Sequence, residues 1–117
     1  MSQEKIGLLT LRLGLSVVYI YFGVSQLMDT NLWSMAIPAW AVSITSLSAI
    51  TLVKINAIFE IVLASLLAIG FQARVISFVL AAHLALITFI MGFNPTGVRD
   101  FGLTVATLAH GLMEKGK

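Results

Sequence analysis

The sequence predicts an all-α integral membrane protein: an antiparallel bundle of four transmembrane helices with an interfacial loop between the first two. Of its 117 residues, 59% are hydrophobic and only 10% are charged, whereas soluble domains average about 45–50% and about 25%. The mean hydropathy is +1.02, and so short a chain cannot hide that much apolar surface in a water-facing core. Four apolar stretches fill nearly the whole chain, so we expect a single membrane domain over residues 1–117.

The expected spans cover about residues 6–28, 47–70, 75–93 and 97–113. Each approaches the length of about 20 residues that crosses the hydrocarbon core of a bilayer. The first apolar run is longer than a signal-peptide core, so we expect this span to be retained. The connection between the first two spans carries Trp33, Pro38 and Trp40. Because Trp favours the membrane–water interface, we place this loop in the headgroup layer as a short interfacial helix or hairpin.

The basic residues predict the orientation. With four spans, Lys5, Arg74, Lys115 and Lys117 fall on one side of the membrane. Arg99 is the clear basic loop residue on the other side. The positive-inside rule then predicts a multi-pass protein of the cell membrane with both termini in the cytoplasm.

The charges at the helix ends have a simpler interpretation. Arg74 follows the turn between the second and third spans, and Arg99 and Asp100 open the fourth. A carboxylate in the first turn of a helix is stabilised by the helix dipole. We interpret all three residues as helix-terminus charges.

A polar stripe follows one face of the first span. Its members are spaced alternately four and three residues apart, which places them on one side of a helix. They are Arg12, Ser16, Tyr19, Gly23 and Gln26. We expect this face to point into the bundle. An alternative is that the small residues only allow close packing and that Arg12 extends to the cytoplasmic headgroups.

The second span carries Asn56 and Glu60, four residues apart and therefore on one face. Glu60 lies about 15 Å inside the membrane, where a carboxyl must be protonated, paired or beside water. We expect an ion pair between Arg12 and Glu60, which either fixes the helix register or belongs to a functional pocket. The candidate pocket consists of Arg12, Ser16, Tyr19, Gln26, Asn56, Glu60 and His83.

Composition and motifs exclude several functional classes. The net charge is only +2 and the chain has no cysteine, which argues against nucleic-acid partners, disulfides and thiolate metal sites. His83 and His110 raise the possibility of a haem, but their expected depths differ by several ångströms. The known nucleotide-binding, zinc-peptidase and serine-hydrolase motifs are absent from the sequence, so we predict neither a catalytic residue nor a metal site.

Three stretches carry a family resemblance. RLGLSVVYIYFGVSQLMDTNLW with the following IPAW, then FEIVLASLLAIGFQARVISFVLAAHLALI, and finally RDFGLTVATLAHGL resemble the DoxX/DoxD-like membrane proteins over about residues 10–112. The resemblance implies a four-helix membrane bundle. Some members of that family are subunits of thiosulfate:quinone oxidoreductase, and others are associated with redox complexes.

The resemblance identifies residues at recurrent positions of the family, but it implies no catalytic residue. Recurrent family positions are matched by Arg12, Gly14, Gly23, Glu60, Arg74 and Asp100. Gln26 stands where many members have lysine, so the charged site of those members is altered here.

Three functions remain open at this point. The first is an accessory subunit of a membrane redox complex, not catalytic alone, with a quinone or lipid pocket inside the bundle. The second is a structural scaffold without a redox role. The third is transport of a small solute or protons, although the helices lack the broken segments of transporters. The expected partners are the lipid bilayer and further copies of this chain or other membrane-complex subunits.

Overall fold

The computed structural model describes residues 2–91 and 95–114, and every regular element in those two ranges is a helix. The elements are α1 (Gln3–Met28), α2 (Thr30–Ser34), α3 (Ala39–Thr45), α4 (Ala49–Ile69), α5 (Ala73–Met91) and α6 (Pro95–Met113). The all-α prediction is confirmed. The four long helices lie where the four spans were expected, and the expected loop is formed by α2 and α3.

Two of these helices are long and apolar enough to cross a membrane, judged by length and composition. They are α1 and α4. The apolar part of α5 is shorter and covers Ala73–Phe89.

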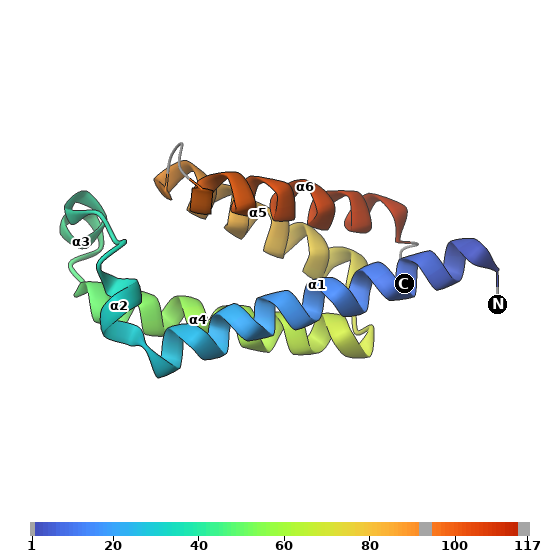
Figure 1. Ribbon diagram of the computed structural model, residues 1–117, viewed down its shortest axis with the longest axis horizontal. Helices are drawn as coiled ribbons and strands as arrows, with labels where there is room; N and C mark the ends of the chain where they lie inside the picture. The colour runs from blue at the N-terminus through green and yellow to red at the C-terminus, as the bar shows by residue number, and fades with distance from the viewer. Residues whose placement is uncertain (1, 92–94, 115–117) are drawn as a thin grey trace.

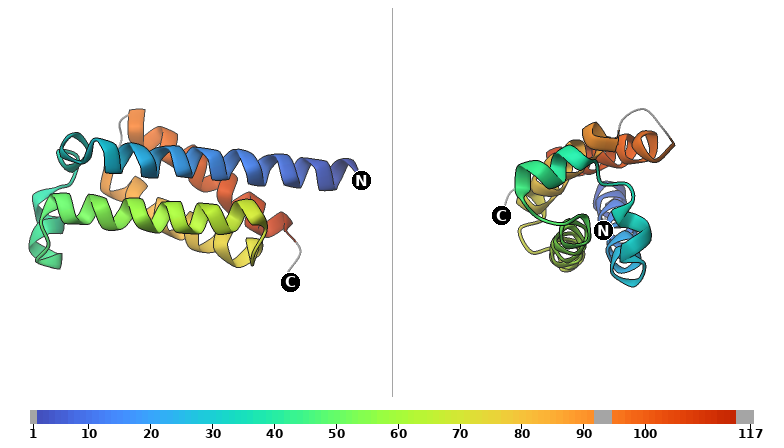
Figure 2. Two further views of the ribbon diagram at one scale, coloured as in Figure 1. Left: turned by 90° about the horizontal axis from the view of Figure 1, so that it is seen from below. Right: turned by 90° about the vertical axis from the view of Figure 1, so that its left-hand side faces the viewer.

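The helices pack mainly as two pairs, α1 with α4 and α5 with α6 (Figure 1). In the first pair the chains run in opposite directions, because Gly23 meets Ala57 and Ile61 while Gly70 meets Arg12. The start of α1 and the end of α6 lie toward one end of the molecule. The short helices α2 and α3 lie at the other end (Figure 2).

Local sequence signals set the helix ends. The Ser2 hydroxyl caps α1 by accepting a hydrogen bond from the Lys5 amide at 3.2 Å. The Ser48 hydroxyl caps α4 in the same way, by accepting a hydrogen bond from the Thr51 amide at 3.2 Å. Such caps satisfy amides that have no partner inside the helix. Gly70 ends α4 in a left-handed conformation with φ +83°, which a side chain would oppose.

The core is a narrow seam between the helices. Its buried apolar members are Leu15, Tyr19, Ala64, Leu67, Ala73, Ile76, Leu80 and Leu84. The outer surface is apolar as well: Val17 is 67% exposed, Ile69 76% and Phe89 80%. A surface so rich in large apolar side chains matches a lipid environment better than water.

The interior also holds several of the polar side chains that the helices carry. The buried polar residues are Ser16, Gln26, Glu60, Ser77, Asp100, Thr107 and His110. Polar groups inside and apolar groups outside are what a bundle in lipid requires, because a polar group facing acyl chains finds no hydrogen-bond partner.

Candidate binding cavity

A cavity of about 490 Å³ lies among the four long helices, at the end covered by α2 and α3. Its walls are mostly apolar, and its aromatic members are Tyr19, Phe22, Trp33, Trp40 and Phe59. The size and the apolar lining are those of a small-molecule site, in which a few polar groups orient the ligand.

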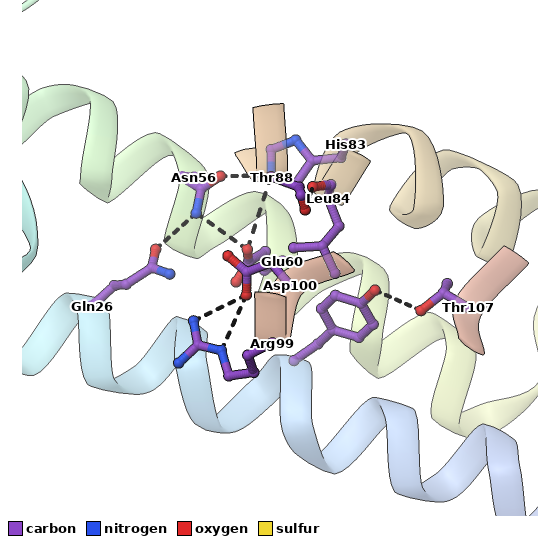
Figure 3. A network of polar contacts seen from close by, with 10 residues as sticks. Gln26, Asn56, Glu60, His83, Leu84, Thr88, Arg99, Asp100 and Thr107 are labelled. Atoms are coloured by element: carbon purple, nitrogen blue, oxygen red, sulfur yellow. Dashed lines mark hydrogen bonds and ion pairs between the residues drawn. The ribbon is translucent and has the colours of Figure 1, made fainter. Parts of the chain in front are cut away.

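Asn56 organises the polar side of the cavity. Its Nδ2 donates to Gln26 Oε1 at 2.9 Å and to Glu60 Oε1 at 3.2 Å, and its Oδ1 accepts from His83 Nε2 at 2.6 Å (Figure 3). All the hydrogen-bonding atoms of this amide except one lone pair are therefore used. The arrangement joins α1, α4 and α5 and leaves the other ring nitrogen of His83 as an acceptor.

Glu60 is the least satisfied member of this group. The residue is 4% exposed, and its Oε1 lies 3.9 Å from His83 Nε2. Its Oε2 is buried and has no hydrogen-bond partner within the described residues. Because buried polar atoms nearly always have a partner, this oxygen calls for a water molecule or a ligand donor.

Arg99 and Asp100 complete the polar wall from α6. Arg99 Nε and Nη2 both donate to Asp100 Oδ1, at 3.1 and 3.0 Å. The guanidinium also lies over the Phe22 ring, 4.3 Å from its centroid, a cation–π contact that ties α6 to α1. Arg99 and Asp100 therefore line the cavity in addition to lying near a helix terminus.

The structure brings together five of the seven residues expected in the pocket. Those that line the cavity are Tyr19, Gln26, Asn56, Glu60 and His83. Ser16 is buried elsewhere, and its hydroxyl donates to the Arg12 carbonyl of its own helix at 2.8 Å.

The expected ion pair between Arg12 and Glu60 is wrong. Arg12 lies at the far end of α4, where a Cβ added to Gly70 would be 3.2 Å from Arg12 Nη1. Gly70 and Glu60 are separated by about 15 Å of helix. The two helices pair in a register that sets Gly23, not Arg12, near the middle of α4, and the depth estimate from sequence missed that offset.

Arg74 lies at the start of α5, as expected, with its guanidinium 5.7 Å from the centroid of the Phe78 ring. Lys115 and Lys117, two of the basic residues that predict the orientation, lie outside the described residues.

A second polar group, missed in the sequence analysis, lies toward the end of the molecule opposite α2 and α3. Tyr19 Oη and Thr107 Oγ1 are 2.7 Å apart, and Ser77 Oγ lies 2.7 Å from His110 Nδ1. His110 Nε2 lies 3.1 Å from Glu114 Oε2. The spacing of these residues did not reveal the group, because the rotation of α6 about its axis depends on its partners. Over the part of the chain that the structure describes, no three His, Asp or Glu side chains gather as a metal site.

This fold and cavity define a helical membrane protein with a polar interior. The DoxX family model matches residues 7–92, which is well over half of the chain. The chain therefore belongs to the DoxX family and is a DoxX-like membrane protein. The matched range includes Gln26, Asn56, Glu60 and His83, whereas Arg99 and Asp100 follow it. Searches of the curated proteins and of the solved structures found no match.

Proposed function

We propose that this protein is an accessory subunit of a membrane-associated redox complex and that its cavity holds a quinone. The observation that carries the proposal is the cavity itself. It has aromatic residues and one polar wall, and it lies inside an apolar bundle. A quinone is an apolar ring with two carbonyl oxygens that accept hydrogen bonds, and its reduced form carries two hydroxyls that donate them. Gln26 and Arg99 offer donors, and Glu60 Oε2 offers a free acceptor.

A quinone in this position would take up two electrons and two protons to form the hydroquinone. The chain has no cysteine, so in this proposal a partner subunit exchanges the electrons. The residues described here bind and orient the ring, and Glu60 and His83 accept or return the protons.

The proposal includes the placement in the membrane. All four long helices cross the cell membrane as an antiparallel bundle, with both termini in the cytoplasm and with α2 and α3 in the outer headgroup layer. The exposed Trp40 on α3 supports this placement, because Trp concentrates at the membrane interface.

The mouth of the cavity supports an occupant that arrives from the bilayer. Four residues that line the cavity are also strongly exposed and apolar: Trp40, Ile44, Ile55 and Leu86. They come from α3, α4 and α5, so the opening faces acyl chains once these helices are in lipid. A long apolar tail would leave through this opening while the head group lies against Asn56 and Glu60.

Tryptophan fluorescence tests the proposal. The chain has two tryptophans, Trp33 and Trp40, and both line the cavity. Titrating the purified protein in detergent with a short-tailed quinone should quench their emission in a saturable manner. The variant Ala41→Phe, which fills the cavity from α3, should abolish saturation. Ala39→Phe adds the same ring at an exposed position outside the lining and should behave as the wild type. Equal, linear quenching in all three proteins would contradict the proposal.

A structural scaffold is the second candidate, and the exposed apolar surface of α2 and α3 favours it. Leu32, Met35 and Ile44 are all more than half exposed there, which suits docking of another membrane subunit. The Ala41→Phe variant separates the two functions. A scaffold should still assemble and support the activity of its complex with the cavity filled, whereas a quinone subunit should assemble but lose that activity.

A further inference from the structure

We propose that a line of buried hydroxyl, imidazole and carboxyl groups on the inner side of α6 is a proton path. It joins the polar wall of the cavity to the opposite end of the molecule. The path requires that the helices cross a membrane, but it does not require that the occupant of the cavity be a quinone.

The path begins at the carboxyl groups of the cavity. Tyr19 lines the cavity together with Glu60 and Asp100. That hydroxyl lies 2.7 Å from Thr107 Oγ1, which in turn donates to the Leu103 carbonyl at 2.7 Å. The Tyr19 hydroxyl is therefore the donor to Thr107, and both side chains are buried.

The path continues through His110, one turn further along α6. Its Nδ1 lies 2.7 Å from the Ser77 hydroxyl and its Nε2 lies 3.1 Å from Glu114 Oε2. An imidazole takes a proton at one nitrogen and releases one from the other, so a polar group at each nitrogen suits a relay. His110 is completely buried, while the Glu114 side chain is 16% exposed at the end of α6.

Unpartnered atoms indicate water along the same line. In the described part of the chain, three buried side-chain atoms have no hydrogen-bond partner: Arg12 Nε, Glu60 Oε2 and His110 Nε2. The contact of His110 with Glu114 has the distance of a hydrogen bond but not the direction. One of these atoms belongs to the cavity wall and two lie toward the far end. Ordered water is the usual partner of such atoms, and water would bridge the gaps between the cavity carboxyls and Tyr19 and between Thr107 and His110.

The line covers about two thirds of the hydrocarbon thickness of a membrane. From Asp100 to Glu114 an α-helix rises about 21 Å, compared with about 30 Å for the hydrocarbon core. On the side of α2 and α3, the cavity would span the rest of the hydrocarbon thickness. As one proton joins a cavity carboxyl, another leaves Glu114, and no bond between heavier atoms changes.

Proton flux into liposomes tests the path. The purified protein would be reconstituted with the pH dye pyranine inside, and a potassium diffusion potential set by valinomycin would drive protons inward. We expect faster acidification than in empty liposomes. Thr107→Val and Tyr19→Phe should each lower the protein-dependent rate at least about tenfold, because a positioned proton donor contributes roughly 10²–10⁴ to transfer rates.

Thr104→Val is the matched control. The Thr104 hydroxyl makes the same bond to the carbonyl four residues earlier, to Asp100 at 2.7 Å, but within the described residues the Tyr19 hydroxyl bonds to Thr107 and not to Thr104. This variant should retain the wild-type flux, and Thr107→Ser, which keeps the hydroxyl, should retain most of it. Thermal melting followed by circular dichroism shows whether each variant is folded.

Two results would overturn the path. One is wild-type flux equal to that of empty liposomes. The other is equal flux in folded Thr107→Val and Thr104→Val. If Thr107→Val does not fold, Tyr19→Phe replaces it in this comparison, because it removes one oxygen and keeps the ring in the core. Equal flux in folded Tyr19→Phe and Thr104→Val would then overturn the path. Saturable quenching of Trp33 and Trp40 by quinone is measured separately, so failure of the path leaves the proposed function to its own test.

Discussion

Asn56 shows how one side chain organises the polar interior. It bonds to three residues on three helices, Gln26 on α1, Glu60 on α4 and His83 on α5. Because its amide directs donors to two carbonyl-type oxygens and an acceptor to an imidazole N–H, it also sets which nitrogen of His83 remains free. The pocket therefore depends on a residue that carries no charge.

Replacing this amide should destabilise the fold. Asn56→Leu has a similar volume but leaves the oxygens of Gln26 and Glu60 and the N–H of His83 without their partner. We expect the free energy of unfolding in detergent to fall by about 1–3 kcal/mol, the cost of leaving buried polar groups unsatisfied. Denaturant titration followed by circular dichroism measures this change. Asn31→Leu at an exposed position of α2 should cost much less, and equal losses in the two variants would contradict the role given to Asn56.

Sequence spacing predicted the part of the site that depends on one helix alone, but not the contacts that depend on how two helices pack. Asn56 and Glu60 share a face whatever their neighbours do, because helix geometry alone fixes that relation. The partner of Arg12 was predicted wrongly, because it depends on how far α1 slides along α4. The place of Asp100 in the cavity wall was missed for a related reason, since it depends on the rotation of α6.

At the scale of elements, Gly23 sets the approach of α1 to α4. A Cβ added there would overlap Ile61 Cγ1 and would lie 3.1 Å from the Ala57 carbonyl oxygen. Small residues permit such close contacts between membrane helices, where packing replaces the hydrophobic effect as the main attraction.

Gly23→Ala should therefore push α1 away from α4. We expect a loss of about 1–3 kcal/mol in unfolding free energy, typical of overpacking, and a lower melting temperature. Gly14→Ala is the control, because an added Cβ there meets no atom within 4 Å. Helix propensity should make that variant more stable by up to about 1 kcal/mol. Two variants with the same melting temperature would show that α1 and α4 do not meet at Gly23.

The two short helices α2 and α3 stand where a short interfacial helix or hairpin was expected. Their tryptophans and proline indicated the place, but the helices are too short for periodicity to predict. Trp33 Nε1 donates to Ser25 Oγ at 3.2 Å and so fixes α2 against the end of α1. This contact closes one side of the cavity, a consequence that the sequence alone did not reveal.

At the scale of the whole molecule, composition was the most informative property. With 59% hydrophobic residues, the helices place large apolar side chains on their outer surface and bury several polar ones in the interior. This arrangement is the reverse of that in a water-soluble protein and follows from the lipid solvent. It does not depend on how individual side chains pack, so a single sequence was enough to predict it. The cavity was harder to predict, since it is the space left over by the packing of all six described helices.

The orientation is testable because the natural chain has no cysteine. Single variants Ser2→Cys, before α1, and Ser43→Cys, on the exposed side of α3, would be treated in intact cells with a membrane-impermeant maleimide. We expect Ser43→Cys to be labelled from outside and Ser2→Cys only after the membrane is permeabilised. The reverse pattern, or labelling of both in intact cells, would contradict cytoplasmic termini.

The most direct test of the cavity as a binding site is an experimental structure of the protein purified gently from its native membrane. We predict non-protein density between the helices, with a compact head beside Asn56 and Glu60 and a tail that leaves between α3, α4 and α5. A cavity filled by the chain's own side chains, with Glu60 turned toward lipid, would contradict this account.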